Sequence, residues 1–149
     1  MAHFAELDIN NKVVRVLTAC NQDIADNGGE QSEQAANYFG TYTPFSENGV
    51  KWIQTSYNHN FRGKFAGIGD TFDYSKNKFI QAKPFESWLL DANDKWQAPI
   101  AYPTIITFGD NVKYIISWNE TEQKWTGIDD KFNEFYWIPE SLSWLATGN

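Results

Sequence analysis

Residues 7–13, Leu-Asp-Ile-Asn-Asn-Lys-Val, decide the fold, because the same order of residue types returns three more times along the chain. Residues 90–96, Leu-Asp-Ala-Asn-Asp-Lys-Trp, match them position for position in type, and residues 72–79 and 118–125 are looser copies. Each copy has an apolar residue, an acid or amide, a turn, a lysine and a second apolar residue. Asp, Asn and Ser bend the backbone by local hydrogen bonds, and Asn tolerates positive φ. The pattern therefore predicts four β-hairpins.

The copies begin at irregular intervals, with onsets near residues 7, 72, 90 and 118. Repeat architectures need a nearly constant period, so the copies indicate a reused hairpin pattern and not a solenoid or propeller. Apolar and polar residues alternate beside the turns, which is typical of half-buried strands. Strands are predicted at residues 3–8, 12–17, 50–55, 105–108 and 114–118, the last two paired with each other.

Two segments between the strands differ from this β pattern. Helix formers collect at residues 31–39, followed by Gly40 as a stop, whereas residues 21–30 are predicted to form a loop.

We therefore expect a mainly β fold with one short helix. Its hairpins would form an antiparallel sheet, a sandwich or a partly open barrel. An α+β arrangement is the alternative. The length of 149 residues fits a single domain over residues 1–149.

The charge balance argues against a nucleic-acid partner. Twelve basic against nineteen acidic residues give a net charge of −7, which repels a phosphate backbone. No apolar run approaches the roughly 20 residues of a membrane-spanning helix, and the first residues lack the pattern of a secretion signal. We expect neither nucleic-acid binding nor membrane insertion. Cys20 is the only cysteine, which rules out an internal disulfide, and this small apolar thiol is expected in the core.

Residue types that carry chemistry are sparse. His3 and His59 have no carboxylate or second histidine at ligand spacing, so no metal site is predicted. The three glycines within residues 63–69 lack the order of a phosphate-binding loop and are expected in tight turns. Arg62 is one of only two arginines, and we expect it to anchor a loop.

Four acids beside tryptophans suggest sugar chemistry: Asp91, Asp94, Glu120 and Glu122. A glycosidase needs two carboxyl groups at a fixed separation, one of them with a raised pKa. All four acids fall in predicted hairpin turns, where solvation would leave their pKa values ordinary. We therefore expect no enzymatic activity, no catalytic residue, no metal and no cofactor.

Two interpretations are open for the tryptophans beside these acids, Trp88, Trp96, Trp118 and Trp125. Exposed indole faces would stack on sugars, which makes these four the candidate residues of a non-catalytic glycan-binding module. In the other interpretation, the rings on either side of each hairpin face each other and the core. Burial of the indoles would favour the second interpretation.

The C-terminal segment stays aromatic almost to its end, as residues 135–145 show. A soluble chain seldom leaves such rings in water. The segment therefore either packs back on the domain or forms the contact surface for a partner. Tyr136, Trp137 and Trp144 are the candidate partner-binding residues, because large rings contribute most to buried contacts.

Several motifs together resemble a family. Residues 52–62 contain Trp-x-Gln-Thr-Ser-Tyr-Asn and Asn-x-Arg, residues 66–69 are Ala-Gly-Ile-Gly, and residues 84–88 and 96–99 contain Pro-Phe-x-Ser-Trp and Trp-x-Ala-Pro. This order resembles a widespread family of small, mostly uncharacterised proteins of marine tailed bacteriophages, cyanophages among them. The likeness covers residues 1–103 as a family-like core.

The remaining residues, 104–149, add hairpins and the aromatic tail, although residues 118–125 resemble the hairpin that closes the family pattern. The resemblance implies a phage virion accessory protein, either a capsid decoration protein or a tail or fibre component. Its expected partners are other virion proteins, and further copies of itself in a homo-oligomer. Its expected location is the virion, assembled in the host cytoplasm. The alternative is the glycan-binding module, attaching to host-surface glycans, and a third option is a host-takeover protein.

Overall fold

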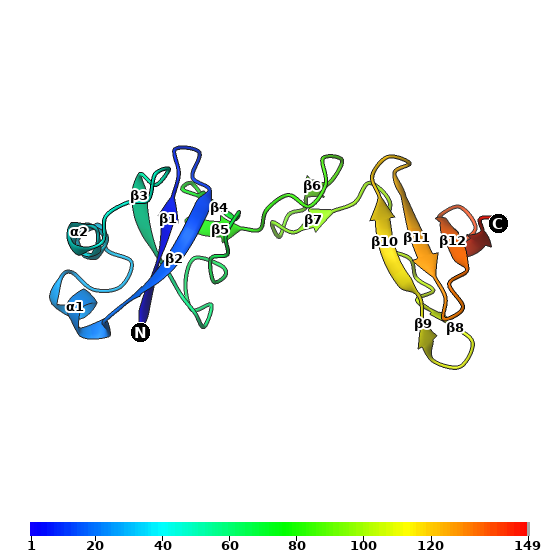
Figure 1. The fold of residues 1–149 in the computed structure, drawn as a ribbon, viewed down its shortest axis with the longest axis horizontal. Coiled ribbons are helices and arrows are strands. Elements are labelled where there is room, and N and C mark those ends of the chain that lie inside the picture. Colours follow the sequence, from blue (N-terminus) through cyan, green and yellow to red (C-terminus); the bar gives the residue numbers. More distant parts are fainter. Residues whose placement is uncertain (149) are drawn as a thin grey trace. The chain divides into compact units, whose positions relative to one another are not determined.

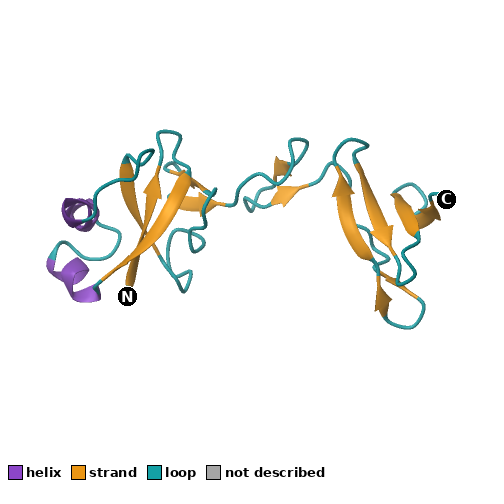
Figure 2. Ribbon diagram, viewed as in Figure 1, coloured by secondary structure: helices purple, strands orange, loops and turns teal. Residues whose placement is uncertain are grey.

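The computed structural model describes residues 1–148 and divides the chain into two compact units, Met1–Ala82 (unit 1) and a second beginning at Lys83 (unit 2). Strands make up 35% of the chain and helices 11%, which confirms a mainly β fold of antiparallel sheets (Figure 2). The division follows Ala82, whereas the sequence analysis expected one domain with a subdivision after residue 103. Phe85 and Trp88 account for the difference, because they pack on the core of the second unit.

Unit 1 is built on a three-stranded antiparallel sheet in the order β2-β1-β3, with two helices and a small hairpin beside it (Figure 1). Its elements are β1 (Ala2–Leu7), β2 (Val13–Ala19), α1 (Asn21–Asp26), α2 (Glu33–Tyr42), β3 (Lys51–Thr55), β4 (Thr71–Asp73) and β5 (Lys78–Ile80). The predicted hairpin of β1 and β2, the strand at β3 and the hairpin of β4 and β5 are confirmed.

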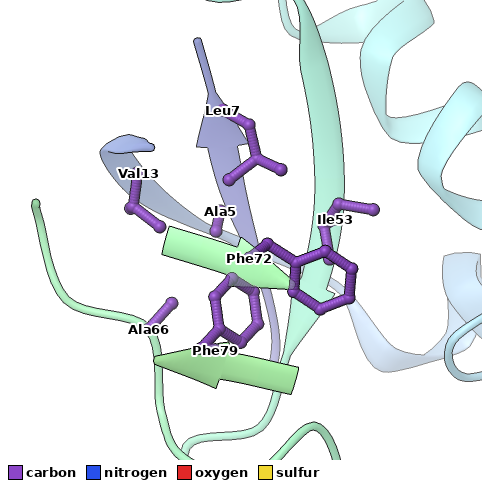
Figure 3. Packing of buried hydrophobic residues seen from close by; sticks show 7 residues of the cluster. All are labelled: Ala5, Leu7, Val13, Ile53, Ala66, Phe72 and Phe79. Carbon is purple, nitrogen blue, oxygen red and sulfur yellow. The ribbon is translucent and has the colours of Figure 1, made fainter. Parts of the chain in front are cut away.

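The central strand β1 is buried on both faces. On one face, Ala5 and Leu7 pack against the rings of Phe72 and Phe79 from the β4–β5 hairpin (Figure 3). On the other face, Phe4 belongs to the cluster that the helices cover. Because consecutive side chains of a strand point to opposite faces, one strand of six residues serves two hydrophobic clusters.

The helices depart from the predictions in two places. Residues 21–30 contain α1, where a loop was predicted, because Ile24 is 2% exposed and anchors this short helix in the core. The predicted helix at residues 31–39 exists as α2, capped by the Ser32 hydroxyl, which accepts from the Ala35 N–H. It continues through Gly40 instead of stopping there. A Cβ at Gly40 would lie 3.2 Å from Trp52 Cδ1, so the glycine allows the helix to approach β3 closely.

Unit 2 contains a four-stranded antiparallel meander in the order β10-β11-β12-β13, together with two short hairpins. The strands of the meander are β10 (Ile115–Asn119), β11 (Lys124–Ile128), β12 (Glu134–Ile138) and β13 (Ser143–Ala146). The strands of the short hairpins are β6 (Leu89–Leu90), β7 (Trp96–Gln97), β8 (Thr107–Phe108) and β9 (Val112–Lys113). The predicted hairpins at residues 90–96 and 118–125 are confirmed.

The predicted pairing of residues 105–108 with 114–118 is confirmed next to the turn at residues 109–111, where the Tyr114 N–H donates to the Ile106 carbonyl, but it is wrong for residues 115–118. Strand β8 pairs with β9, and the chain then leaves this hairpin so that β10 pairs with β11. The Trp118–Trp125 pair explains the outcome, because these residues lie directly opposite each other and bury both indoles. Burial of these two large rings stabilises the fold more than a longer β8–β9 ladder would.

Three hairpin turns share one pattern of side-chain hydrogen bonds. An Oδ1 atom of Asp8, Asp91 or Asp129 accepts the backbone N–H groups of the residues two and four positions later, at 2.8–3.0 Å. The backbone closes each turn in the same way. The repeated pattern predicts the first two turns but not the one at Asp129, which has Asn133 directly before its second strand where the other two turns have a lysine.

One carboxylate of unit 1 is fully buried. Glu6 on β1 is 0% exposed and faces Arg15 on β2 and Trp52 on β3 across the ladder. Its oxygens accept from Arg15 Nε and from the backbone N–H and hydroxyl of Ser46, at 2.6 and 2.8 Å. Arg15 also donates to the Pro44 carbonyl at 2.7 Å. These bonds fasten the loop between α2 and β3 to the sheet.

We predict that Glu6→Gln lowers the free energy of unfolding by about 1–3 kcal/mol near neutral pH, because the charged acceptor of these bonds is lost. Burial alone would raise the pKa of Glu6, but the bonds from Arg15 and Ser46 outweigh burial and lower it. The stability that this group contributes is present above the ordinary glutamate pKa of 4.5 and is lost as the pH falls through the lowered value. The wild type should therefore lose its advantage over Glu6→Gln on acidification below 4.5.

Urea denaturation across that pH range measures the difference. Glu47→Gln, an exposed acid in the same loop, is the matched control and should unfold like the wild type. An advantage over Glu6→Gln that stays constant with pH would contradict the prediction.

Candidate functional site

Three of the four predicted glycan-binding tryptophans lie together in the core of unit 2. Trp118 and Trp125 are each 7% exposed, and the Trp88 ring meets them edge to face at centroid distances of 6.2 and 5.8 Å. Trp96 is partly buried and lies outside this cluster, with the Lys83 ammonium 5.8 Å from its ring centroid. The interpretation that the hairpin rings face each other and the core is therefore confirmed for Trp118 and Trp125.

The buried indoles use their N–H groups within unit 2. Trp118 Nε1 donates to Glu120 Oε2 at 2.7 Å, and Trp125 Nε1 donates to the Ile100 carbonyl at 2.8 Å. Trp88 Nε1 is buried without a hydrogen-bond acceptor among the described residues, and its ring meets its neighbours edge to face. These contacts leave the cluster closed to a sugar ring.

Two of the acids near the tryptophans, Glu120 and Asp91, do not have the ordinary pKa values that were expected from the sequence. The pKa of Glu120 is lowered by hydrogen bonds from Trp118 Nε1 and from the hydroxyl and N–H of Ser87. The pKa of Asp91 is lowered first by the N–H of Lys95 in the turn. A general acid needs a raised pKa, so both shifts run opposite to that requirement.

The three predicted partner-binding residues belong to the meander. Trp137 on β12 is 3% exposed and lies directly opposite Trp144 on β13, with ring centroids 5.3 Å apart. Trp144 Nε1 donates to the Ile105 carbonyl at 2.7 Å. Tyr136 is half-buried beneath the Lys124 ammonium, 4.3 Å from its ring centroid. The tail thus packs back on its own unit, and the Trp137 ring offers no free face to a partner.

A different part of unit 2 exposes apolar side chains. Ile115 at the start of β10 is 67% exposed, and its ladder partner Ile128 leads directly into the turn at residues 129–133, where Phe132 is 84% exposed. Ile106 is 42% exposed, and its carbonyl accepts the Tyr114 N–H at 2.9 Å, next to Ile115. We call Ile106, Ile115 and Phe132 the apolar end of unit 2.

Phe132 also has an unusual backbone. The three matching turns each have one residue with positive φ, and it is Asn11 at 63° in the first turn and Asp94 at 57° in the second. Asn and Asp tolerate this region, but the third turn places Phe132 there at 63°. A bulky residue at positive φ costs about 1–3 kcal/mol, and such residues gather at binding and switch sites. Phe132 was not predicted as a site residue because this turn lies outside the repeated hairpin pattern.

The remaining candidates lie as follows. His3 stacks on Tyr57, and His59 Nδ1 accepts the Phe65 N–H at 3.0 Å. Cys20 is exposed, where a core position was expected, because it stands outside the core at the junction of β2 and α1. Residues 1–148 contain no group of three or more His, Cys, Asp or Glu side chains able to hold a metal ion. No helix in that part of the chain has the length and apolar character to cross a bilayer.

Arg62 anchors loops, as predicted. Its side chain donates to the carbonyls of Gln54 and Gln31 and to Asn77 Oδ1, at 2.8, 3.2 and 3.2 Å. It also lines a cavity between α2 and β3, which sequence reasoning missed because the walls come from segments far apart in the chain. The rarity of arginine in this sequence was the one available signal.

We predict that the Glu120 carboxylate titrates below the ordinary glutamate value of 4.5 and moves toward it in Trp118→Phe, which removes the indole donor. Carbon-detected NMR of the side-chain carboxyl, assigned with Glu120→Gln, measures the midpoint. A midpoint above 4.5 would instead give Glu120 the character of a general acid.

Comparisons with protein-family models, with curated proteins and with solved structures find no match for this chain.

Proposed function

We propose that the chain is a non-catalytic accessory protein of a bacteriophage virion, a capsid decoration protein or a tail or fibre component that binds other virion proteins. The resemblance of residues 1–103 to marine phage proteins suggests the setting. The observation that carries the binding role is Phe132, which combines 84% exposure with a strained backbone. Neither feature stabilises the free chain, and both are explained if the ring is buried against a partner.

The apolar end of unit 2 has the composition of a contact site. Ile106, Ile115 and Phe132 are exposed apolar side chains, with Ile115 at the start of β10 and Phe132 in the turn between β11 and β12. Asp129 and Lys131 in the adjoining turn supply a charged border. A central apolar anchor with a polar rim is typical of protein interfaces. We assign the partner contact to this end and not to Trp137, whose ring is buried.

The glycan-binding alternative is not favoured at the tryptophans first considered. Trp118 and Trp125 are buried, and Trp88 is packed against both of them. Stacking on a sugar needs an open ring face, and the Trp96 face near Lys83 carries an ammonium group instead. Trp118 and Trp125 therefore offer no open ring face to a sugar.

The variant Phe132→Asn should affect the stability of the free chain and the strength of the partner contact in different ways. Asn tolerates positive φ, so the free energy of unfolding should stay equal or rise by about 1 kcal/mol. Loss of the ring should weaken the partner contact by more than about 2 kcal/mol. In phage that carry the change, the copy number of the chain per purified particle, measured by quantitative mass spectrometry, should fall.

Ile9→Asn is the matched control, because Ile9 is 83% exposed in the equivalent turn of unit 1 and does not have positive φ. It should leave the copy number unchanged. Absence of the wild-type chain from purified particles would reject the virion role. An unchanged copy number for Phe132→Asn would reject the contact at the apolar end.

A further inference from the structure

A cavity of about 650 Å³ opens in unit 1 between α2 and β3. This volume lies within the range of about 300–1,000 Å³ that is usual for small-molecule sites. Helix α2 contributes Asn37 to the wall, and β3 contributes Lys51 and the buried ring of Trp52. Arg62 and Tyr74 come from the loops after β3. The wall residues used below are Asn37, Phe45, Lys51, Trp52, Arg62 and Tyr74.

The Arg62 guanidinium is held in this wall by neutral atoms only. It donates to two carbonyls and one amide oxygen, and its Cζ lies 5.5 Å from the centroid of the Phe72 ring. A guanidinium has five N–H donors. Two of them therefore have no acceptor among the described protein atoms.

No carboxylate in the described part of the chain forms an ion pair with Arg62. Glu33 is the one acid on the cavity wall, and it is exposed. The other arginine, Arg15, is paired with Glu6. Burial lowers the pKa of Arg62, because its charge is partly removed from water without an anion nearby. A partly desolvated cation with free N–H donors is a strong binding site for an oxyanion, which accepts those hydrogen bonds.

We propose that the cavity binds a small acidic sugar, with the carboxylate or phosphate of the sugar at Arg62. Lys51, whose ammonium lies 4.9 Å from the Tyr74 ring centroid, is a second cation on the same wall. The Asn37 side chain is exposed and has no protein partner among the described residues, so it is free to bond a sugar hydroxyl. Phe45 is 47% exposed and stacks on Trp52 through one face, so its other face is the ring surface that a sugar would contact.

The wall favours this ligand class over two others. Two cations match a ligand with one or two negative charges, whereas a nucleic acid would meet the net charge of −7. A purely apolar ligand would leave the Arg62 donors without acceptors. The site lies in unit 1 and is independent of the partner contact proposed for unit 2.

The two arginines make a direct test possible, because the full chain has only two Arg Nε–H signals in a nitrogen–proton NMR spectrum. Titration with glucuronate and with glucose 6-phosphate should shift the Arg62 signal saturably, with a Kd of about 1 mM or tighter for at least one of them. The Arg15 signal, held by Glu6, should stay in place. Glucose and inorganic phosphate are the comparison ligands.

Lys51→Glu reverses a charge on the cavity wall without touching the bonds of Arg62, and it should weaken binding about fivefold or more. Lys113→Glu makes the same charge change on an exposed lysine outside the cavity, and it should leave binding unchanged. Arg62→Lys keeps the charge but loses the fork of donors, so binding should fall further. Its thermal unfolding shows whether the loops remain anchored, and Lys51→Glu stays informative if they do not.

Four outcomes would overturn the proposal. They are the absence of a saturable shift with either acidic sugar, equal binding of glucose, binding of inorganic phosphate as tight as that of glucose 6-phosphate, and equal weakening by Lys51→Glu and Lys113→Glu. A shift confined to Arg62 that weakens only in Lys51→Glu and Arg62→Lys supports it.

Discussion

In unit 1 the Glu6 carboxylate is withdrawn from water, and the bonds from Arg15 and Ser46 compensate for the loss of hydration. Several features depend on that arrangement. The loop between α2 and β3 is fixed by Ser46, and Gly49 in the same loop is required because a Cβ there would overlap the carboxylate. With the loop fixed, Trp52 is covered and the cavity between α2 and β3 keeps its wall.

Unit 2 reaches a stable core by a different route. Its central cluster contains Trp118, Trp125 and Trp137, and the N–H groups of the first two are satisfied by Glu120 and by the Ile100 carbonyl. Indoles combine a large apolar area with one donor, so each needs only a single acceptor at the edge of the cluster. The aromatic tail is structural for the same reason, because Trp144 packs on Trp137 and donates to the Ile105 carbonyl.

The two proposed sites follow a common physical logic. At the apolar end a bulky ring is held at positive φ and in water, and in the cavity a guanidinium is partly buried without an anion. Each is an unfavourable state of the free chain that a bound group would relieve. The surrounding turns and strands supply the stability that maintains these states.

The sequence by itself determined the four hairpins of the repeated pattern, the mainly β class and the presence of α2, because these depend on groups within a few positions of each other. Asp8 and Asp91 close their turns with the N–H groups of residues two and four positions later, which a local pattern can show. Only the tertiary structure decided the burial of the indoles, the helix at α1, the boundary after Ala82 and the cavity around Arg62. Those features arise from contacts between distant segments, where burial and packing outweigh local propensity.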